Sequence, residues 1–282
     1  MQTIGILGKH TNHKIANTLN ALIAGVLAKN KKVIVDENCK YFVDGYAVEY
    51  LPLDELKKSV DVLAVIGGDG SLLKAARLAA GHAPIIGINR GTVGFLADIS
   101  PLELEKSIKE LLEGHYTREK RSLVEAIVTK EDGSVKKAIA LNDAVLFSGN
   151  IARMIKFDVL VNNEEIFSLR SDGIIVSTPT GSTAYGLSAG GPIVNPSLDA
   201  LILVPLNPHT MSKRPIVLNG NDIIELRLQT DMQTKLCLDG QTTIELNKND
   251  KIKIKKYSHQ LELIHPNNYS YFNTLRNKLN WV

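Results

Sequence analysis

The residues best suited to chemistry in this 282-residue chain lie at positions 67–71, which read GGDGS. They directly follow the apolar run 62–66 (VLAVI), and its branched side chains favour a strand buried on both faces of a parallel sheet. Ser71 is predicted to cap a helix that continues to Arg77. A strand, a glycine turn and a helix start form an anion site. The first amides of a helix point outward, its dipole favours negative charge, and glycine has no Cβ to hold a phosphate away.

Asp69 is the unexpected member of this turn, because bound phosphates repel a carboxylate that has no task. Three tasks suit it: general base toward an attacking hydroxyl, anchor for Mg²⁺, or hydrogen-bond acceptor from a ribose hydroxyl. A tight turn whose aspartate only caps the helix is the alternative. The chain contains neither the GxxxxGK[ST] of a P-loop nor the GxGxxG of a dinucleotide fingerprint.

A second candidate is the segment 170–195, which is rich in glycine, serine and threonine. A short strand over 174–177, a polar loop over 178–182 and a helix beginning at Thr183 are predicted there. The polar part holds almost no charge and is flanked by strands, which favours a ligand-contacting loop over a flexible connector. Tyr185 could stack on a base or simply fill a gap in the core.

Three further groups of residues are ambiguous by themselves. Asn142 and Asp143 could bind ribose hydroxyls or a carboxamide, although a simple turn is the better interpretation without context. Arg153 and Arg170 would suit a pyrophosphate, yet isolated arginines are normally surface residues. Residues 239–241 (DGQ) have the spacing of a hairpin turn.

The elements that must position these residues fall into two groups. Up to about Tyr116, strands alternate with helices, which predicts an α/β domain with a mostly parallel sheet. Ligands on such sheets bind beyond the carboxyl ends of the strands, where the loop at Gly67 and a second loop over 89–92 are predicted. Helices are predicted over 14–30, from Asp54 (as the cap) to Lys58, and over 101–113, and strands over 3–7, 32–35, 62–66 and 84–88.

After Tyr116, short alternating strands separated by turn residues predict a β-rich domain. The predicted strands cover 122–129, 135–141, 155–161, 164–169, 174–177, 215–218, 222–228, 235–238, 242–246, 251–256 and 261–264. A terminal helix over 271–279 presents Phe272, Leu275 and Leu279 on one face and is expected to pack on the first domain. We therefore expect one domain over 1–118, completed by 268–282, and a second over 119–267.

Composition excludes several classes of protein. Apolar residues make up 44% of the chain and charged residues 22%, which allows a sizeable core and disfavours disorder. The net charge of +3 comes without a basic stripe, so we expect no nucleic-acid partner. No apolar run is long enough to cross a membrane, and the N-terminus lacks the pattern of a signal peptide. Cys39 and Cys237 show no metal-binding spacing and are expected to be free thiols in the cytoplasm.

Together these residues resemble the NAD kinase family over essentially the whole chain. The GGDG turn is shared with a wider superfamily of lipid and sugar kinases, whereas the segment TPTGSTAYGLSAGGPI at 178–193 is specific to NAD kinases. The other matching segments are LND at 141–143, RSDG at 170–173, VPLNPHTMSKRP at 204–215 and FNTLRNKLNW at 272–281.

The resemblance implies a Rossmann-like α/β domain followed by a β-rich domain that binds NAD. It implies phosphoryl transfer from ATP with Mg²⁺, or from polyphosphate, to the 2′-hydroxyl of the adenosine ribose of NAD. Asp69 falls on the family's proton acceptor, and Asp143 stands where the family has Glu, one methylene longer. It also implies a homotetramer or homodimer whose sites borrow residues from a neighbour. The implied NAD-binding residues are Asp69, Gly70, Lys74, Asn142, Asp143, Arg153, Arg170, Asp172, Thr180, Thr183, Ala184, Tyr185, Gly186, Leu187, Ser188 and Gln241.

Two other functions remain open at this point. The GGDG turn alone also permits a kinase that acts on a lipid or a sugar. A non-catalytic NAD-binding regulator could use the same scaffold, but it would have no need of the Asp69 carboxylate as a base. A purely structural protein fits these motifs least well.

Overall fold

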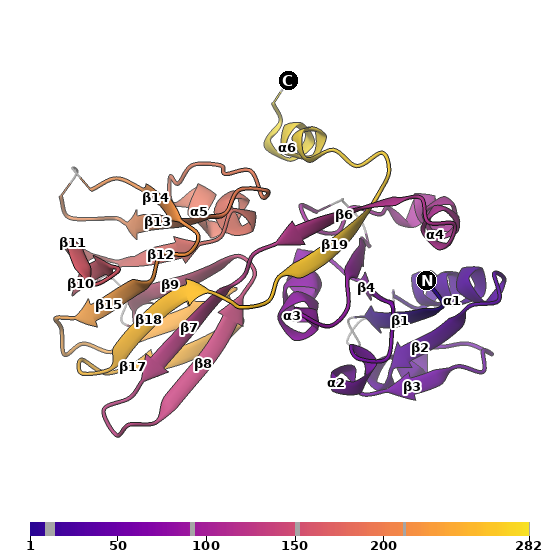
Figure 1. The fold of residues 1–282 in the computed structure, drawn as a ribbon, viewed down its shortest axis with the longest axis horizontal. Coiled ribbons are helices and arrows are strands. Elements are labelled where there is room, and N and C mark those ends of the chain that lie inside the picture. Colours follow the sequence, from indigo (N-terminus) through magenta and orange to yellow (C-terminus); the bar gives the residue numbers. More distant parts are fainter. Residues whose placement is uncertain (9–14, 91–93, 150–152, 211–212, 282) are drawn as a thin grey trace. The chain divides into compact units, whose positions relative to one another are not determined.

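The computed structural model describes residues 1–8, 15–90, 94–149, 153–210 and 213–281. The chain divides into two compact units, residues 1–120 with 261–282, and residues 121–260. Each unit has its own sheets and its own core (Figure 1). Among the described residues, no helix combines the length and the apolar character needed to cross a membrane.

The first unit is a seven-stranded sheet in the order β3-β2-β1-β4-β5-β19-β6. Each neighbouring pair from β3 to β19 runs parallel. The strands are β1 (Thr3–Gly8), β2 (Lys32–Asp36), β3 (Glu49–Leu51), β4 (Val62–Ile66), β5 (Ile85–Ile88), β6 (Tyr116–Arg121) and β19 (Leu261–Pro266). The predicted mostly parallel sheet is confirmed.

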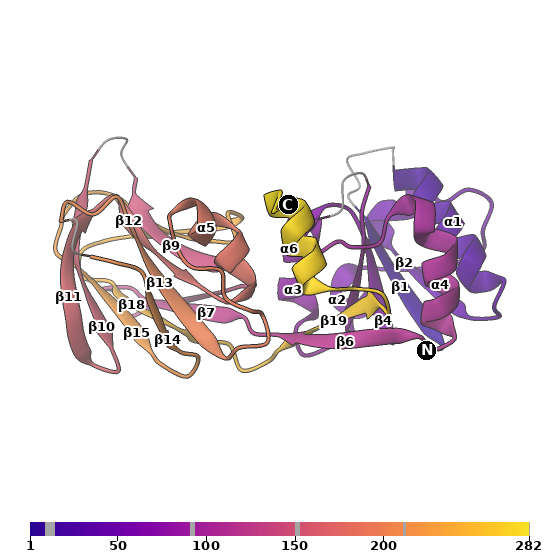
Figure 2. The same ribbon diagram turned by 90° about the horizontal axis from the view of Figure 1, so that it is seen from above.

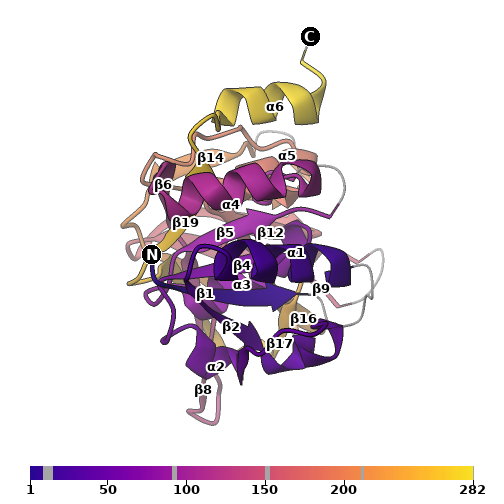
Figure 3. The same ribbon diagram turned by 90° about the vertical axis from the view of Figure 1, so that its right-hand side faces the viewer.

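Helices cover both faces of this sheet. The apolar sides of α1 (Ala16–Leu27) and α4 (Leu104–Leu112) share one core with β1, β2 and β4, whereas α3 (Asp69–Ala79) lies on the opposite face (Figure 2). In Figure 3, α4 runs beside α1. The other helical segments are η2 (Glu37–Phe42), α2 (Leu53–Leu56), η3 (Pro101–Glu103) and α6 (Tyr271–Leu279).

The second unit consists of two six-stranded antiparallel sheets that enclose one apolar core. The first has the order β11-β10-β15-β18-β7-β8, with strands β7 (Val124–Thr129), β8 (Val135–Ala140), β10 (Ile155–Val161), β11 (Glu164–Ser171), β15 (Ile224–Leu228) and β18 (Lys251–Lys256). The second has the order β14-β13-β12-β9-β16-β17, with β9 (Asp143–Ser148), β12 (Gly173–Ser177), β13 (Ala200–Leu206), β14 (Ile216–Asn219), β16 (Thr234–Leu238) and β17 (Thr242–Leu246). The predicted β-rich second domain is confirmed.

A smaller apolar cluster lies on the outer face of the second sheet. It contains Val145, Ile175 and Val204, and residues from the segment 189–194 pack against it. That segment follows the short helical turns η4 (Thr180–Thr183) and α5 (Tyr185–Ser188). The glycine-rich polar segment therefore folds over a sheet face.

Four sequence predictions about these elements are wrong. Gly68, not Ser71, is the N-cap of α3, because the turn needs an extended residue there. Pro52, not Asp54, precedes α2, and Asp54 instead binds Lys57 at 2.8 Å. Phe272 is exposed on α6, where Leu275 is buried. Residues 261–266 were expected in the second domain but form β19, whose backbone pairs with β5 of the first sheet.

Candidate functional site

Asp69 occupies the first residue of α3, immediately after the glycine turn that ends β4. The turn must be tight because a Cβ at Gly67 would collide with the side chain of Ser71. Gly68 and Gly70 are exposed and a Cβ on either would meet nothing, so the backbone there is open to a ligand. The predicted strand, glycine turn and helix start are confirmed. The first amides of a helix in this position suit an anion.

Three consecutive backbone amides hold the carboxylate of Asp69. Phe95 N–H donates to Oδ2 at 3.0 Å, and Leu96 N–H and Ala97 N–H both donate to Oδ1 at 3.2 Å. A Cβ at Gly94 would collide with the same carboxylate, so only glycine fits there. This segment fixes where the carboxylate points, and an orientation of this kind is what a general base needs.

Two other predicted residues of the first unit lie on the same helix. Gly70 belongs to the first turn of α3, and Lys74 is exposed one turn further along. In the second predicted loop, the buried Asn89 donates from its amide to the carbonyl of Ala97 at 3.3 Å, so it supports the segment that holds Asp69. Residues 91 and 92 of that loop lie outside the described residues.

The described residues contain no group of three His, Cys, Asp or Glu side chains arranged to hold a metal ion. The protein therefore suits Mg²⁺ only as it is usually bound with nucleotides. In that form ATP phosphates and water supply most of the ligands, and the protein adds one or two carboxylates. Asp69, beside the glycine turn, is the carboxylate that would serve as such a ligand.

In the second unit, a cavity of about 610 Å³ lies on the outer face of the sheet that contains β9. Along β9, Asp143, Val145 and Phe147 face the cavity, while Ala144 and Leu146 face the core between the sheets. The period of two along a strand explains this division. The remaining lining residues are Asn142, Ser148, Arg153, Asp172, Ala184, Tyr185, Leu206, Asn207, Cys237, Asp239 and Gly240.

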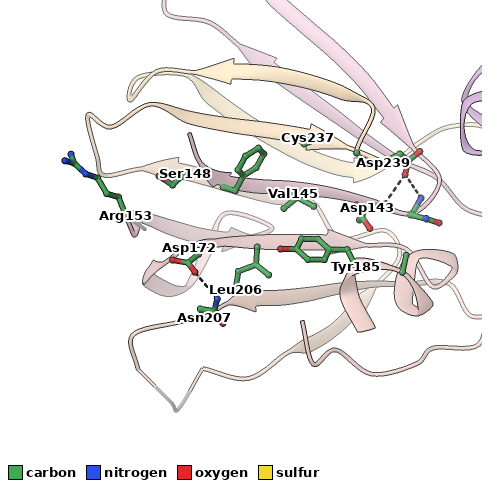
Figure 4. Close-up of a pocket in the computed structure, with 14 residues that line it drawn as sticks. Asp143, Val145, Ser148, Arg153, Asp172, Tyr185, Leu206, Asn207, Cys237 and Asp239 are labelled. Atoms are coloured by element: carbon green, nitrogen blue, oxygen red, sulfur yellow. Dashed lines mark hydrogen bonds between the residues drawn. The ribbon is translucent and has the colours of Figure 1, made fainter. Parts of the chain in front are cut away.

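At one end of this cavity two aspartates lie close together (Figure 4). The Asp239 carboxylate accepts hydrogen bonds from the backbone amides of Leu141, Asn142 and Asp143 at 3.0, 2.8 and 3.4 Å. Asp143 is only 5% exposed. Burial and, second, the charge of Asp239 raise the pKa of the Asp143 carboxyl to about 7. Near neutral pH this carboxyl can therefore donate a hydrogen bond as well as accept one.

Tyr185 and a polar group line other parts of the cavity (Figure 4). The Tyr185 ring is 48% exposed, so it does not simply fill a core gap. Asp172 accepts a hydrogen bond from the Asn207 side chain at 2.9 Å. Arg153 is exposed at the end opposite to Asp143. An apolar floor with an aromatic ring and a few polar groups at the rim is typical of a pocket that binds a small molecule.

The structure brings together only part of the predicted set. Asn142, Asp143, Arg153, Asp172, Ala184 and Tyr185 line the cavity, whereas Arg170, Thr180, Thr183, Gly186, Leu187, Ser188 and Gln241 are not among its lining residues. The Thr180 hydroxyl is buried and accepts a hydrogen bond from Arg121 at 3.3 Å, which gives it a structural task. Arg170 and Gln241 are exposed.

Sequence reasoning missed the lining residues Val145, Phe147, Ser148, Leu206, Asn207, Cys237, Asp239 and Gly240. The apolar ones could have been found only by recognising β9, β13 and β16 as strands of one sheet with one face outward. Asp239 carried a signal, because an aspartate in a DG turn can adopt a positive φ, here 52°, and so turn its carboxylate toward another backbone.

Comparison with known proteins agrees with this geometry. The ATP-NAD kinase N-terminal domain family matches residues 4–116, and the ATP-NAD kinase C-terminal domain family matches residues 141–266. An NAD kinase of Coxiella burnetii (strain Dugway 5J108-111) is 44% identical over 281 residues, which cover 99% of this chain and 94% of the relative. An NAD kinase of Saccharophagus degradans is 42% identical over 282 residues, covering 99% of this chain and 96% of the relative.

Solved structures show the same architecture. The crystal structure of an NAD kinase from Archaeoglobus fulgidus in complex with ATP has a TM-score of 0.80 and 26% identity, and the match covers 100% of both chains. That of yeast NADH kinase complexed with NADH has a TM-score of 0.88, covers 100% of this chain and 88% of the yeast chain, and at 23% identity shows the fold alone. The chain therefore belongs to the ATP-NAD kinase family and is an enzyme of that type.

Proposed function

We propose that this enzyme transfers the γ-phosphoryl group of ATP to the 2′-hydroxyl of the adenosine ribose of NAD, giving NADP and ADP. The observation that carries the proposal is the Asp69 carboxylate, held by three amides beside the glycine turn. The turn suits phosphates, and the carboxylate suits a hydroxyl that must lose a proton. NAD and ATP are proposed as the substrates because the chain belongs to the ATP-NAD kinase family.

In the proposed reaction the ribose 2′-oxygen attacks the γ-phosphorus. The bond from that phosphorus to the bridging β–γ oxygen breaks, and the hydroxyl proton passes to Asp69. Mg²⁺ bound by ATP would neutralise the charge of the phosphates. The amides of 95–97 keep the Asp69 carboxylate in one orientation, and orienting groups contribute much of the rate in phosphoryl transfer.

We propose that the cavity of the second unit binds NAD. Tyr185 would stack on an aromatic ring of the dinucleotide, and Asn142 and Asp143 would bind ribose hydroxyls or the carboxamide. Arg153, Asp172 and the other residues that matched the family pattern remain predicted contacts. Their support is the cavity of about 610 Å³ with an apolar floor and two aspartates at one end.

The test is a coupled assay of NADP formation from NAD with ATP and Mg²⁺, run beside polyphosphate as an alternative donor. Asp69→Asn keeps the shape of the side chain but removes its basicity, so kcat should fall roughly 10²–10⁴-fold with little change in KM. Glu105→Gln, an exposed change on α4, is the matched control and should keep normal turnover. Near-normal kcat in Asp69→Asn would show that the base is another group.

Two alternatives are separated by the same assay. A lipid kinase would phosphorylate diacylglycerol in place of NAD, and a non-catalytic regulator would bind NAD without consuming ATP.

We also propose, from the family resemblance, that the enzyme acts in the cytoplasm as a homotetramer or homodimer. Light scattering on the purified enzyme measures its oligomeric state.

A further inference from the structure

A buried histidine of the first unit lies between two carboxylates and belongs to none of the motifs described above. His265, at 2% exposure on β19, donates from Nδ1 to Asp98 Oδ2 at 2.8 Å. Its Nε2 lies 3.2 Å from Oε2 of Glu119 on β6. Its ring also stacks on that of Tyr269, with 3.9 Å between centroids and 9° between planes. The imidazole is therefore fixed on three sides.

Asp98 connects this histidine to the segment that holds Asp69. It directly follows Ala97, the last of the three residues whose amides bind the Asp69 carboxylate. The Asp98 side chain is 7% exposed, and it accepts the hydrogen bond of His265. Only one peptide unit therefore separates Asp98, which contacts His265, from the backbone amide of Ala97.

Two other hydrogen bonds of the segment join residues that are close in the sequence. Gly94 N–H donates to the Ala97 carbonyl at 2.9 Å, which closes a turn. Asn89 N–H donates to the Ile99 carbonyl at 2.8 Å, which joins the segment to β5. These bonds attach both ends to neighbouring backbone, whereas the Asp98–His265 bond attaches the segment to a strand from the far end of the chain.

We infer that His265 is a positioning residue for phosphoryl transfer, which acts through Asp98 on the amides of 95–97 and so on the orientation of Asp69. The inference rests on the proposed role of Asp69 as base. Losing the Nδ1 bond frees Asp98 and lets the turn over 94–97 shift, and the amides then no longer hold the carboxylate in one place. A misplacement of about 1 Å at a reacting group can lower the rate by about 10²-fold.

Two substitutions at His265 separate this role from a purely structural one. The amide nitrogen of Asn reaches the place of Nδ1, so His265→Asn keeps a donor toward Asp98. That of Gln reaches the place of Nε2, so His265→Gln keeps a donor toward Glu119 and loses the Asp98 bond. Both lose the stack on Tyr269, so their melting temperatures should fall by similar amounts. We expect kcat to fall roughly tenfold in His265→Gln and within about twofold in His265→Asn, with KM for NAD little changed in both.

Asp98 provides a second matched pair if either histidine variant folds poorly. Asp98→Asn keeps an acceptor oxygen for Nδ1–H and should retain kcat, whereas Asp98→Ala should lose it like His265→Gln. The inference would be overturned if kcat fell equally in both members of each pair, or if it fell in no variant. A change in KM without a change in kcat would also overturn it.

Adding His265→Gln to Asp69→Asn tests whether the effect passes through the base. If it does, the double variant should be no slower than Asp69→Asn, since the oriented carboxylate is already gone. A further tenfold loss would show that His265 acts elsewhere. Normal kcat in Asp69→Asn alone would instead refute the proposed role of Asp69 as the base, so the two failures are distinguishable.

Discussion

Asp143→Asn removes a carboxyl whose charged form is opposed both by burial and by the neighbouring charge of Asp239. The replacement has nearly the same volume and carries no charge at any pH. At pH values where Asp143 is ionised in the native protein, the second unit of this variant should therefore be more stable than that of the native protein. The size of the gain should depend on pH.

The magnitude follows from the pKa. A rise from 3.8 in the unfolded chain to about 7 in the folded one costs about 4 kcal/mol once Asp143 is fully ionised. Between these two values the native state binds more protons than the unfolded state, so stability falls as pH rises toward 7. Below 3.8 both states are protonated and the cost vanishes. From about pH 5 to about pH 8 the advantage of Asp143→Asn should grow by about 3 kcal/mol.

Urea unfolding followed by far-UV circular dichroism at these two pH values measures this difference. Glu164→Gln, an exposed change at the first residue of β11 in the same unit, is the control and should give the same small effect at both pH values. An advantage of Asp143→Asn that does not change with pH would refute the reasoning, because its only pH-dependent source is the raised pKa.

Three other changes test contacts within each unit. Gly94→Ala places a methyl group against the Asp69 carboxylate, so kcat for NADP formation should fall roughly tenfold or more; an unchanged kcat would show that the carboxylate needs no fixed position. Asp239→Ala leaves the amides of 141–143 without their acceptor and should cost roughly 3 kcal/mol of stability in urea unfolding. It should also lower the pKa of Asp143 toward its usual range, which carbon NMR of that carboxyl can follow, and an unmoved pKa would contradict the charge effect. Tyr185→Ala should weaken NAD binding roughly tenfold in calorimetry while Tyr185→Phe should not, if the ring stacks on the ligand.

Elements with a strong local pattern were predictable from the sequence. The strands β4, β10 and β18 and the helix α6 begin and end where their patterns indicate. Strand β6 was missed because its charged sequence YTREKR, at the edge of the sheet, lacks the alternation of a half-buried strand. The position of β19 could not be predicted, since strand partners are chosen by tertiary packing and not by local pattern.

The candidate site shows the same division. The glycine turn and Asp69 follow from five consecutive residues, whereas the amides that hold Asp69 lie 26 to 28 positions further along. Cys237 lines the cavity because β16 pairs with β9, which places it opposite Val145. Residue types thus predicted the chemistry, while the groups that orient those residues depend on long-range pairing.

The origin of β19 in the last 22 residues has a consequence for how the protein is made. On the ribosome, residues 121–260 are all synthesised before the strand that joins β5 to β6 exists. Until then β5 is an edge strand with unpaired backbone groups, and these can pair with another nascent chain. A transcript truncated after residue 260 should therefore give a product whose β-rich part resists proteolysis while its first 120 residues aggregate or are degraded.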